Sequence, residues 1–259
     1  MEPRDLATRL PDEPRCVDLR GLLLSGRCRV FPEWPQEGEG FVVRSNDFPY
    51  AAVAGTPTAA AVRAAVEGAD AAATAWAGEG SEGEWHVLVP PEAADAVHAV
   101  LPVEWSRRGV VIHALAGDVP TAGEAPDGAE IRLAPQGYTA AGFDLSHLPS
   151  PLATEYAGEH VSRRPLAAAF VDDRAAAICY APISTESLWD VAVDTLAPYR
   201  RRGLAAACYR ALAAHLAAER GLAPVWGALT ENRASLRLAG KLGFEPVAEL
   251  TSIVLKTTR

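Results

Sequence analysis

Apolar residues in the first half of the chain gather in short runs that are separated by glycine, proline and acidic residues. Four of these runs have the length and the β-branched or aromatic content of strands: 40–45 (GFVVRS), 50–55 (YAAVAG), 85–90 (WHVLVP) and 109–117 (GVVIHALAG). Two alanine-rich stretches favour helices, 56–68 with Thr56 or Thr58 near its N-cap and 90–101 with proline in its first turn. The predicted order is therefore β-β-α-β-α-β.

The second half opens with a segment that has no hydrophobic periodicity. Residues 116–130 (AGDVPTAGEAPDGAE) are rich in glycine, proline and acids, which is typical of a linker. The pair Asp172-Asp173, flanked by apolar runs, predicts the turn of an antiparallel hairpin. Strands are expected in the apolar stretches around this turn and after it: 129–135, 164–182 as the hairpin, 187–196, 224–229 and 244–257.

Helices are expected at three places in the second half. Two short helices are predicted within 142–163, where the periodicity is weak. A long alanine-rich helix is predicted over 203–220, where Gly221 stops it, and another over 232–242, which Gly243 ends.

The linker divides the chain into two predicted domains, residues 1–120 and residues 127–259. A hydrophobic content of 49% and a charged content of 22% are those of a folded globular protein. The net charge of −9 comes from residues 1–126, which contain 10 Arg and 19 Asp or Glu, whereas residues 127–259 contain 14 Lys or Arg and 14 Asp or Glu. Binding of nucleic acid requires a basic face that displaces counterions. Neither half offers one, so we predict no nucleic-acid partner.

Four cysteines lie far apart and form no CxxC pair: Cys16, Cys28, Cys179 and Cys208. This spacing argues against a zinc site or a disulfide framework and favours a reducing compartment, so we predict no metal and a cytoplasmic location. No apolar run approaches the roughly 18 residues of a membrane-spanning helix. The N-terminus, MEPRDLATRLPDEPR, is too charged for a signal peptide, and we predict no membrane partner.

The stretch PYRRRGLAAACYRAL, residues 198–212, places three arginines and Gly203 at the start of a predicted helix. A helix N-terminus presents unpaired N–H groups and a partial positive charge, which favour an anion such as phosphate. Gly203 allows the backbone to approach an oxygen closely, and Ala205 is nearly as small. The alternative is that the arginines form a solvated turn and Gly203 simply connects it to the helix.

Two motifs at a suitable separation resemble a known family. A strand followed by R-x-x-G-x-A, here Arg200 to Ala205, resembles the acyl-CoA pyrophosphate loop of the GCN5-related N-acetyltransferases (GNAT). The stretch ENRASLRLAGKLGFEPV resembles a second family landmark, with Asn232, a helix and Gly243-Phe244. The resemblance covers residues 127–259. It implies an α/β (α+β) domain with a mixed, mostly antiparallel sheet flanked by helices.

The resemblance also implies acetyl-CoA as the acyl donor. The backbone of the splayed strand would pair with the pantetheine arm, and the amides of the loop and the first helical turn would bind the pyrophosphate. Asn232 would hydrogen-bond the pantetheine or serve as the N-cap of its helix. The implied cofactor-binding residues are Val193, Asp194, Thr195, Arg200, Arg201, Arg202, Gly203, Leu204, Ala205, Ala206 and Asn232.

Acetyl transfer to an amine requires an oxyanion donor and a base for the amine's proton. A backbone N–H near Val193 would serve as the donor. The candidate bases are Asp190, the first choice, Glu186 and Asp194. These three share one face of a regular strand. The corresponding strand of the family commonly has a bulge, however, so the sequence does not assign each of these side chains to a face of the sheet.

At the position where the family commonly has the acid that protonates the leaving thiolate, this sequence differs. Many members have a tyrosine seven residues after the asparagine, and this position is Ala239. Tyr199, Tyr209 and Ser235 are nearby hydroxyls, but none stands at the matching position. Either water protonates the thiolate or the acid comes from elsewhere.

The first half has an order of strands and helices similar to the second, but it contains no R-x-x-G-x-G/A motif. It is either a degenerate GNAT-like copy that shapes the acceptor cleft or an unrelated α/β domain. We expect the C-terminal domain to acetylate a primary amine of a small molecule or peptide, with a homodimer left open. The alternative, favoured by the missing tyrosine, is a non-catalytic acyl-CoA sensor or scaffold.

Overall fold

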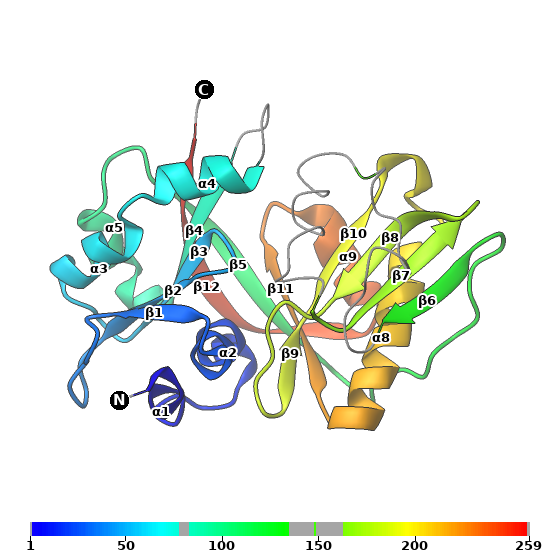
Figure 1. Ribbon diagram of the computed structural model, residues 1–259, viewed down its shortest axis with the longest axis horizontal. Coiled ribbons are helices and arrows are strands. Elements are labelled where there is room, and N and C mark those ends of the chain that lie inside the picture. Colours follow the sequence, from blue (N-terminus) through cyan, green and yellow to red (C-terminus); the bar gives the residue numbers. More distant parts are fainter. Residues whose placement is uncertain (1, 78–82, 135–147, 149–162, 258–259) are drawn as a thin grey trace. The chain divides into compact units, whose positions relative to one another are not determined.

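The computed structural model describes residues 2–77, 83–134, 148 and 163–257, and it divides the chain into two compact units (Figure 1). Unit 1 consists of Met1–Ile112, Gly227–Arg233 and Pro246–Arg259. Unit 2 consists of His113–Trp226 and Ala234–Glu245. The units therefore differ in their bounds from the two predicted segments, because the last residues of the chain belong to unit 1.

Unit 1 combines short helices with a sheet. Its helices are α1 Pro3–Ala7, the 3₁₀ helix η1 Pro14–Cys16, α2 Val17–Ser25, α3 Ala59–Val66, α4 Ala69–Ala77, the 3₁₀ helix η2 Pro91–Ala93 and α5 Ala94–Ala99. Its strands are β1 Cys28–Phe31, β2 Phe41–Ser45, β3 Tyr50–Ala54, β4 Glu84–Val89, β5 Ser106–Leu115 and β12 Phe244–Lys256, of which β5 and β12 extend into unit 2.

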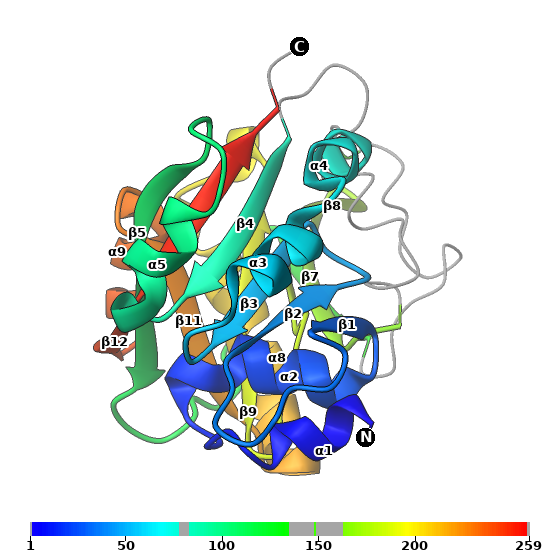
Figure 2. The same ribbon diagram turned by 90° about the vertical axis from the view of Figure 1, so that its left-hand side faces the viewer.

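The strands of unit 1 follow the order β1-β2-β3-β4-β12-β5. β3 pairs in parallel with β4 from Tyr50↔His86 to Ala52↔Leu88, whereas β12 pairs with β4 in the antiparallel sense. Helices α3, α4 and α5 cover one face of β2, β3 and β4 and bury a core around Trp85, while α1 and α2 lie on the other face (Figure 2). Alternation of side chains along the strands supplies both apolar faces.

Unit 2 contains a second sheet, the 17-residue helix α8 and most of the nine-residue helix α9. Its elements are β6 Glu130–Ala134, β7 Leu166–Val171, β8 Arg174–Tyr180, β9 Leu188–Asp190, β10 Ala192–Thr195, the 3₁₀ helix η3 Ala197–Tyr199, α8 Leu204–Arg220, β11 Ala223–Leu229 and α9 Arg233–Lys241. The last residues of β11 and the first of α9 belong to unit 1. Strands β10-β8-β7-β6 form an antiparallel sheet, and β9 pairs in parallel with β11.

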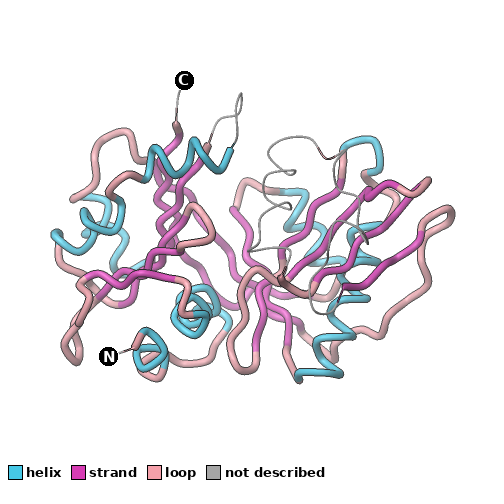
Figure 3. Tube along the Cα trace, viewed as in Figure 1, coloured by secondary structure: helices cyan, strands magenta, loops and turns pink. Residues whose placement is uncertain are grey.

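The long helix and the hairpin of the second half are confirmed. α8 covers Leu204–Arg220, and Gly221 follows it in the left-handed conformation. Asp172 and Asp173 connect β7 to β8 with φ angles of 51° and 58°, which aspartate tolerates better than most residues. The expected linker has no helix or strand between β5 and β6 (Figure 3). The two helices predicted within 142–163 lie outside the described residues, apart from Leu148 and Arg163.

Candidate functional site

The predicted strand 187–196 is two strands, because its halves pair with different partners. β9 pairs with β11 from Leu188↔Ala223 to Asp190↔Val225, and the amide of Val191 donates to the carbonyl oxygen of Val225 at 3.0 Å. β10 then pairs with β8 in the other sheet. The sequence shows no break here, since the alternation of apolar side chains continues across Val191.

The backbone of β10 has one edge that points away from β8. The amide of Leu196 donates to the carbonyl oxygen of Ala176 on the side of β8 at 2.9 Å. In an antiparallel pair, alternate residues direct their N–H and C=O groups to the partner strand. Asp194 therefore also faces β8, whereas Val193 and Thr195 direct their amides to the opposite side. We call these amides the outer edge of β10. They can pair with an added extended chain.

Helix α8 begins next to this strand and lacks a side-chain cap. Its N-cap is Gly203, with φ +81°, and the first intrahelical bond runs from the amide of Ala207 to the carbonyl oxygen of Gly203 at 3.0 Å. The amides of Leu204, Ala205 and Ala206 thus have no intrahelical acceptor. A Cβ atom at Gly203 would meet only Pro126 Cγ at 3.7 Å, so the space around this glycine is open.

The three arginines before the helix are exposed to solvent. Arg200 Nε donates to the carbonyl oxygen of Thr195 at 3.2 Å, so this side chain folds back on the end of β10. Arg201 has φ +64°, and the Arg202 guanidinium lies 5.8 Å from the ring centroid of Tyr199. The loop therefore places positive charge beside the open first turn of α8, where the macrodipole adds to it.

The candidate carboxylates of this strand lie on one face. The amide of Asp190 donates to the carbonyl oxygen of Ile183 and that of Val191 to the opposite side, so the alternation is regular and no extra residue is inserted. The side chains of Asp190 and Asp194 therefore share a face. Asp194 stands opposite Ile178, which packs in a cluster without residues of α8. Both carboxylates are thus on the side of the sheet away from α8.

Glu186 stands apart from these two. It lies in the exposed turn before β9, where the Thr185 hydroxyl accepts the amides of Ser187 and Leu188. Because strand geometry begins only at Leu188, the regular alternation that relates Asp190 to Asp194 does not extend to Glu186.

The hydroxyls near the helix are engaged or buried. Trp226 Nε1 donates to Ser235 Oγ at 2.9 Å. Tyr209 is fully buried between the rings of Trp189, Trp226 and Phe244, and its hydroxyl has no hydrogen-bond partner among the described residues. Burial raises the pKa of Tyr209. Ala239, at the position of the family's tyrosine, is also fully buried.

Two thiols of unit 2 are buried, and the carboxylates act on one of them, Cys179. Burial raises the pKa of Cys179 well above its usual range, and the charges of Asp190 and Asp194 raise it further. Burial raises the pKa of Cys208, on α8, to about 12. Both thiols stay protonated at neutral pH and are poor nucleophiles. Within the described residues, no group of histidine, cysteine and acidic side chains is arranged to hold a metal.

Asn232 directly precedes α9, at the N-cap position, and it is exposed. Its amide donates to the carbonyl oxygen of Leu229 at 2.9 Å. Asn232 belongs to the segment Gly227–Arg233 of unit 1. The loop that contains Arg200, Arg201 and Arg202, which we call the arginine loop, belongs to unit 2.

The corresponding place in unit 1 differs in its chemistry. β3 is followed by Gly55 and α3, as β10 is followed by its loop and α8. The hydroxyl of Thr58 accepts the amide of Ala61 at 3.2 Å and so caps α3. A Cβ at Gly40 would meet the backbone of Thr56 and Pro57 at 2.3–2.5 Å, so this turn is tightly packed. The first turn of α3 is thus closed by the chain itself.

We compared the chain with families and structures of known proteins. Residues 167–253 match the family model for GNAT acetyltransferases. A comparison with the curated proteins finds no match. Among the described residues, no helix combines the length and the apolar character that crossing a membrane requires.

Several solved structures share the fold at low sequence identity. A GCN5-related N-acetyltransferase-like protein from Streptococcus suis is 16% identical with a TM-score of 0.66, over 98% of each chain. A GCN5-related N-acetyltransferase from Kribbella flavida is 18% identical with a TM-score of 0.52, over 95% of this chain and 94% of that one. A tandem GNAT protein from the clavulanic acid biosynthesis pathway is 14% identical with a TM-score of 0.55, over 99% of this chain and 93% of that one.

These likenesses cover the N-terminal part of the chain as well as the C-terminal part, so the predicted GNAT-like mixed fold is confirmed and extends through the whole chain. The residues that match the family model include β9 and β10, which pair in different sheets, the arginine loop and α8. Residues 167–253 of this chain therefore match the GNAT acetyltransferase family, and the chain as a whole resembles GNAT structures in its fold.

Proposed function

We propose that the C-terminal domain transfers an acetyl group from acetyl-CoA to a primary amine of a small molecule or peptide. The observation that supports this most is the continuity of two backbone features in unit 2. The outer edge of β10 ends at Thr195, and the chain leads from there to the uncapped first turn of α8 within nine residues. An amide-containing arm that ends in a diphosphate matches this pair of features.

In this proposal, the amides of Val193 and Thr195 pair with the pantetheine arm as an added strand would. The amides of Leu204 to Ala206 bind the pyrophosphate, which the helix dipole and the arginine side chains attract. Gly203 keeps the space for the phosphate oxygens free of a side chain. Asn232, as an N-cap or as a donor to the arm, stays a prediction from the family resemblance.

Transfer follows from the same placement. The amine attacks the thioester carbonyl, the C–S bond breaks, and coenzyme A leaves as a thiolate. The Val193 amide donates to the carbonyl oxygen as negative charge develops on it. Asp190 or Asp194 accepts the proton of the amine, directly or through water. Since Ala239 replaces the family's tyrosine, the thiolate takes its proton from water.

The test separates binding from turnover. Calorimetry with coenzyme A measures binding to the wild type and to Gly203 variants. Release of free thiol from acetyl-CoA, followed with a thiol reagent over a panel of primary amines, measures transfer. Binding without thiol release from any amine would favour the second candidate, a non-catalytic acyl-CoA sensor, which the buried alanine at position 239 supports.

A further inference from the structure

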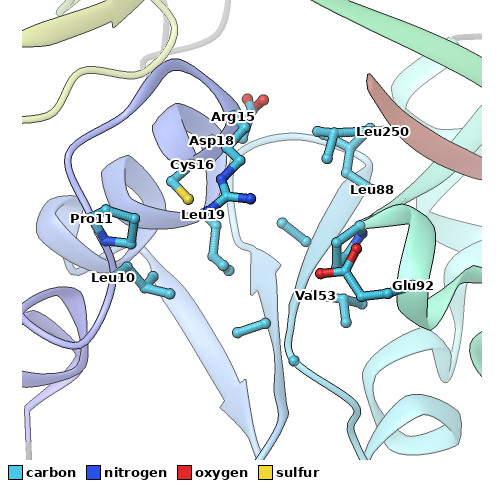
Figure 4. Close-up of a pocket in the computed structure, with 14 residues that line it drawn as sticks. Leu10, Pro11, Arg15, Cys16, Asp18, Leu19, Val53, Leu88, Glu92 and Leu250 are labelled. Carbon is cyan, nitrogen blue, oxygen red and sulfur yellow. The ribbon is translucent and has the colours of Figure 1, made fainter. Parts of the chain in front are cut away.

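Unit 1 contains a cavity of about 190 Å³ on the face of its sheet that α2 covers. All of its lining residues belong to unit 1. Figure 4 shows Arg15, Asp18 and Leu19 on one side of the cavity, with Leu88 and Leu250 across from them. Most of the wall is apolar, and a few polar side chains reach it, which is the composition of small-molecule sites.

The cavity lies where two parallel strands part. The pairing of β3 with β4 ends at Ala52↔Leu88, and the residues just beyond it, Val53 to Gly55 and Pro90, continue the wall. Crevices at the carboxyl ends of parallel strands are frequent binding places in α/β proteins. The sheet topology therefore forms one wall of the cavity, which residues before α2 complete.

Its electrostatic character is set by an acid in the first turn of α2. Asp18 lines the cavity, and the neighbouring buried hydroxyl of Tyr50 lowers the pKa of its carboxyl. Burial nevertheless raises the pKa of Asp18 to about 6. No arginine or lysine of the described chain forms an ion pair with Asp18. A partly buried carboxylate that lacks a cation is less well solvated than one in water, and a cationic ligand would compensate for this.

The other charged side chains of the lining strengthen this preference. Glu92, from η2, is a second acid in the wall and forms no ion pair among the described residues. Arg15 is the basic residue of the lining, but its guanidinium already pairs with Glu13 at 3.2 Å. The cavity therefore has an excess of negative charge.

A phosphate-containing ligand such as coenzyme A does not fit this place. Its diphosphate would need the first turn of α3, which the Thr58 hydroxyl caps and the packing of Gly40 against Pro57 closes. The cavity also has a limited volume: at about 30 Å³ per water molecule, it has room for roughly six non-hydrogen atoms.

We propose that this cavity of unit 1 binds a small primary ammonium ion with a short apolar body, its cationic head on Asp18. The apolar body lies against Leu19, Leu88 and Leu250. The proposal is independent of acyl transfer, because no residue of the arginine loop or of α8 takes part in it.

The test compares three molecules of the same length and different charge: n-pentylammonium, pentanol and pentanoate. Each is titrated into the full chain at neutral pH, with affinity measured by calorimetry. We expect the ammonium to bind at least about tenfold more tightly than either analogue, since it alone carries a positive charge and forms an ion pair with the carboxylate of Asp18. Equal binding of the three molecules, or no binding of the ammonium, would overturn the proposal without any variant.

Two variants then assign the charge preference to one residue. Asp18→Asn should reduce the preference for the ammonium to less than about threefold, while Asp70→Asn, at an exposed acid on α4, should leave it unchanged. Circular dichroism of both variants checks their folding. Retention of the full preference by a folded Asp18→Asn variant would overturn the assignment, and failure of acetyl transfer would leave it untouched.

Discussion

The amide of Val191 donates to the carbonyl oxygen of Val225, and five residues later the amide of Leu196 donates to Ala176 in the other sheet. These two bonds point to opposite sides of the backbone that leads from the end of β9 through β10. Between them, the amides of Val193 and Thr195 face away from β8, and the arginine loop and α8 follow directly. In the proposed function, the acyl-CoA arm pairs with these two amides and its diphosphate with the first turn of α8, and the variants below examine these parts.

The first prediction concerns the glycine at the N-cap of α8. Gly203→Glu should weaken coenzyme A binding at least about 100-fold, because its carboxylate occupies the place of the phosphate and repels it. Gly203→Ala is the matched control, since φ +81° strains any residue with a Cβ and the space is otherwise open. We expect this control to lose about 1 kcal/mol of stability and to keep most of its affinity in calorimetry. Similar affinities of the two variants would contradict the placement of the phosphate.

The second prediction concerns the acids on the strand. If Asp190 is the base, Asp190→Asn should lower kcat about 100-fold or more and leave the dissociation constant of coenzyme A unchanged. Asp194→Asn tests the neighbour on the same face in the same assay. Glu186→Gln is the control, because Glu186 lies in an exposed turn before β9. A large loss of turnover in this control, with both aspartate variants active, would reverse the assignment.

The third prediction concerns the buried tyrosine of α8. Tyr209→Phe should raise the free energy of unfolding by about 1 kcal/mol, because the hydroxyl that it removes is buried and has no partner among the described residues. Denaturant unfolding followed by circular dichroism measures this change. Tyr199→Phe, in the partly exposed η3, should have little effect. A loss of stability in Tyr209→Phe would mean that the hydroxyl is satisfied.

The fourth prediction concerns pH. The folded chain holds Asp18 at a pKa of about 6, above its ordinary value of 3.8, so the folded state binds the proton more tightly than the unfolded state. The contribution of Asp18 therefore destabilises the fold above pH 6, and this cost disappears as the pH falls toward 4. Asp18→Asn should be more stable than the wild type at neutral pH, by up to about 3 kcal/mol.

The measurement is urea unfolding of both proteins at several pH values. The difference between them should shrink below pH 6 and vanish near pH 4. A difference that stays constant with pH would show that Asp18 titrates normally, since only a shifted pKa makes it vary.

Local signals allowed part of this fold to be predicted. α8 follows from a long alanine-rich pattern with glycine at both ends, and the β7–β8 hairpin follows from the Asp172-Asp173 turn. The arginine loop and the start of α8 follow from a short motif with a physical reason for each residue. These features depend on neighbours in sequence, so the sequence contains them.

Features set by distant pairing could not be predicted in the same way. The break at Val191 depends on which strands lie on either side of it, and no residue marks it. The helices before β1 are short, and the five residues of α1 give too little periodicity for a prediction. No function was therefore predicted for Asp18, although it lines the cavity of unit 1.

The passage of the last strand into unit 1 limits how this gene product can be divided. Residues Thr251 to Lys256 pair with β4, so a fragment that starts after the linker would keep the arginine loop but lose β4, the strand that pairs with its own C-terminal end. Such a fragment would expose an unpaired, apolar strand and tend to aggregate. Domain exchanges and gene fusions should therefore keep both halves of the chain together.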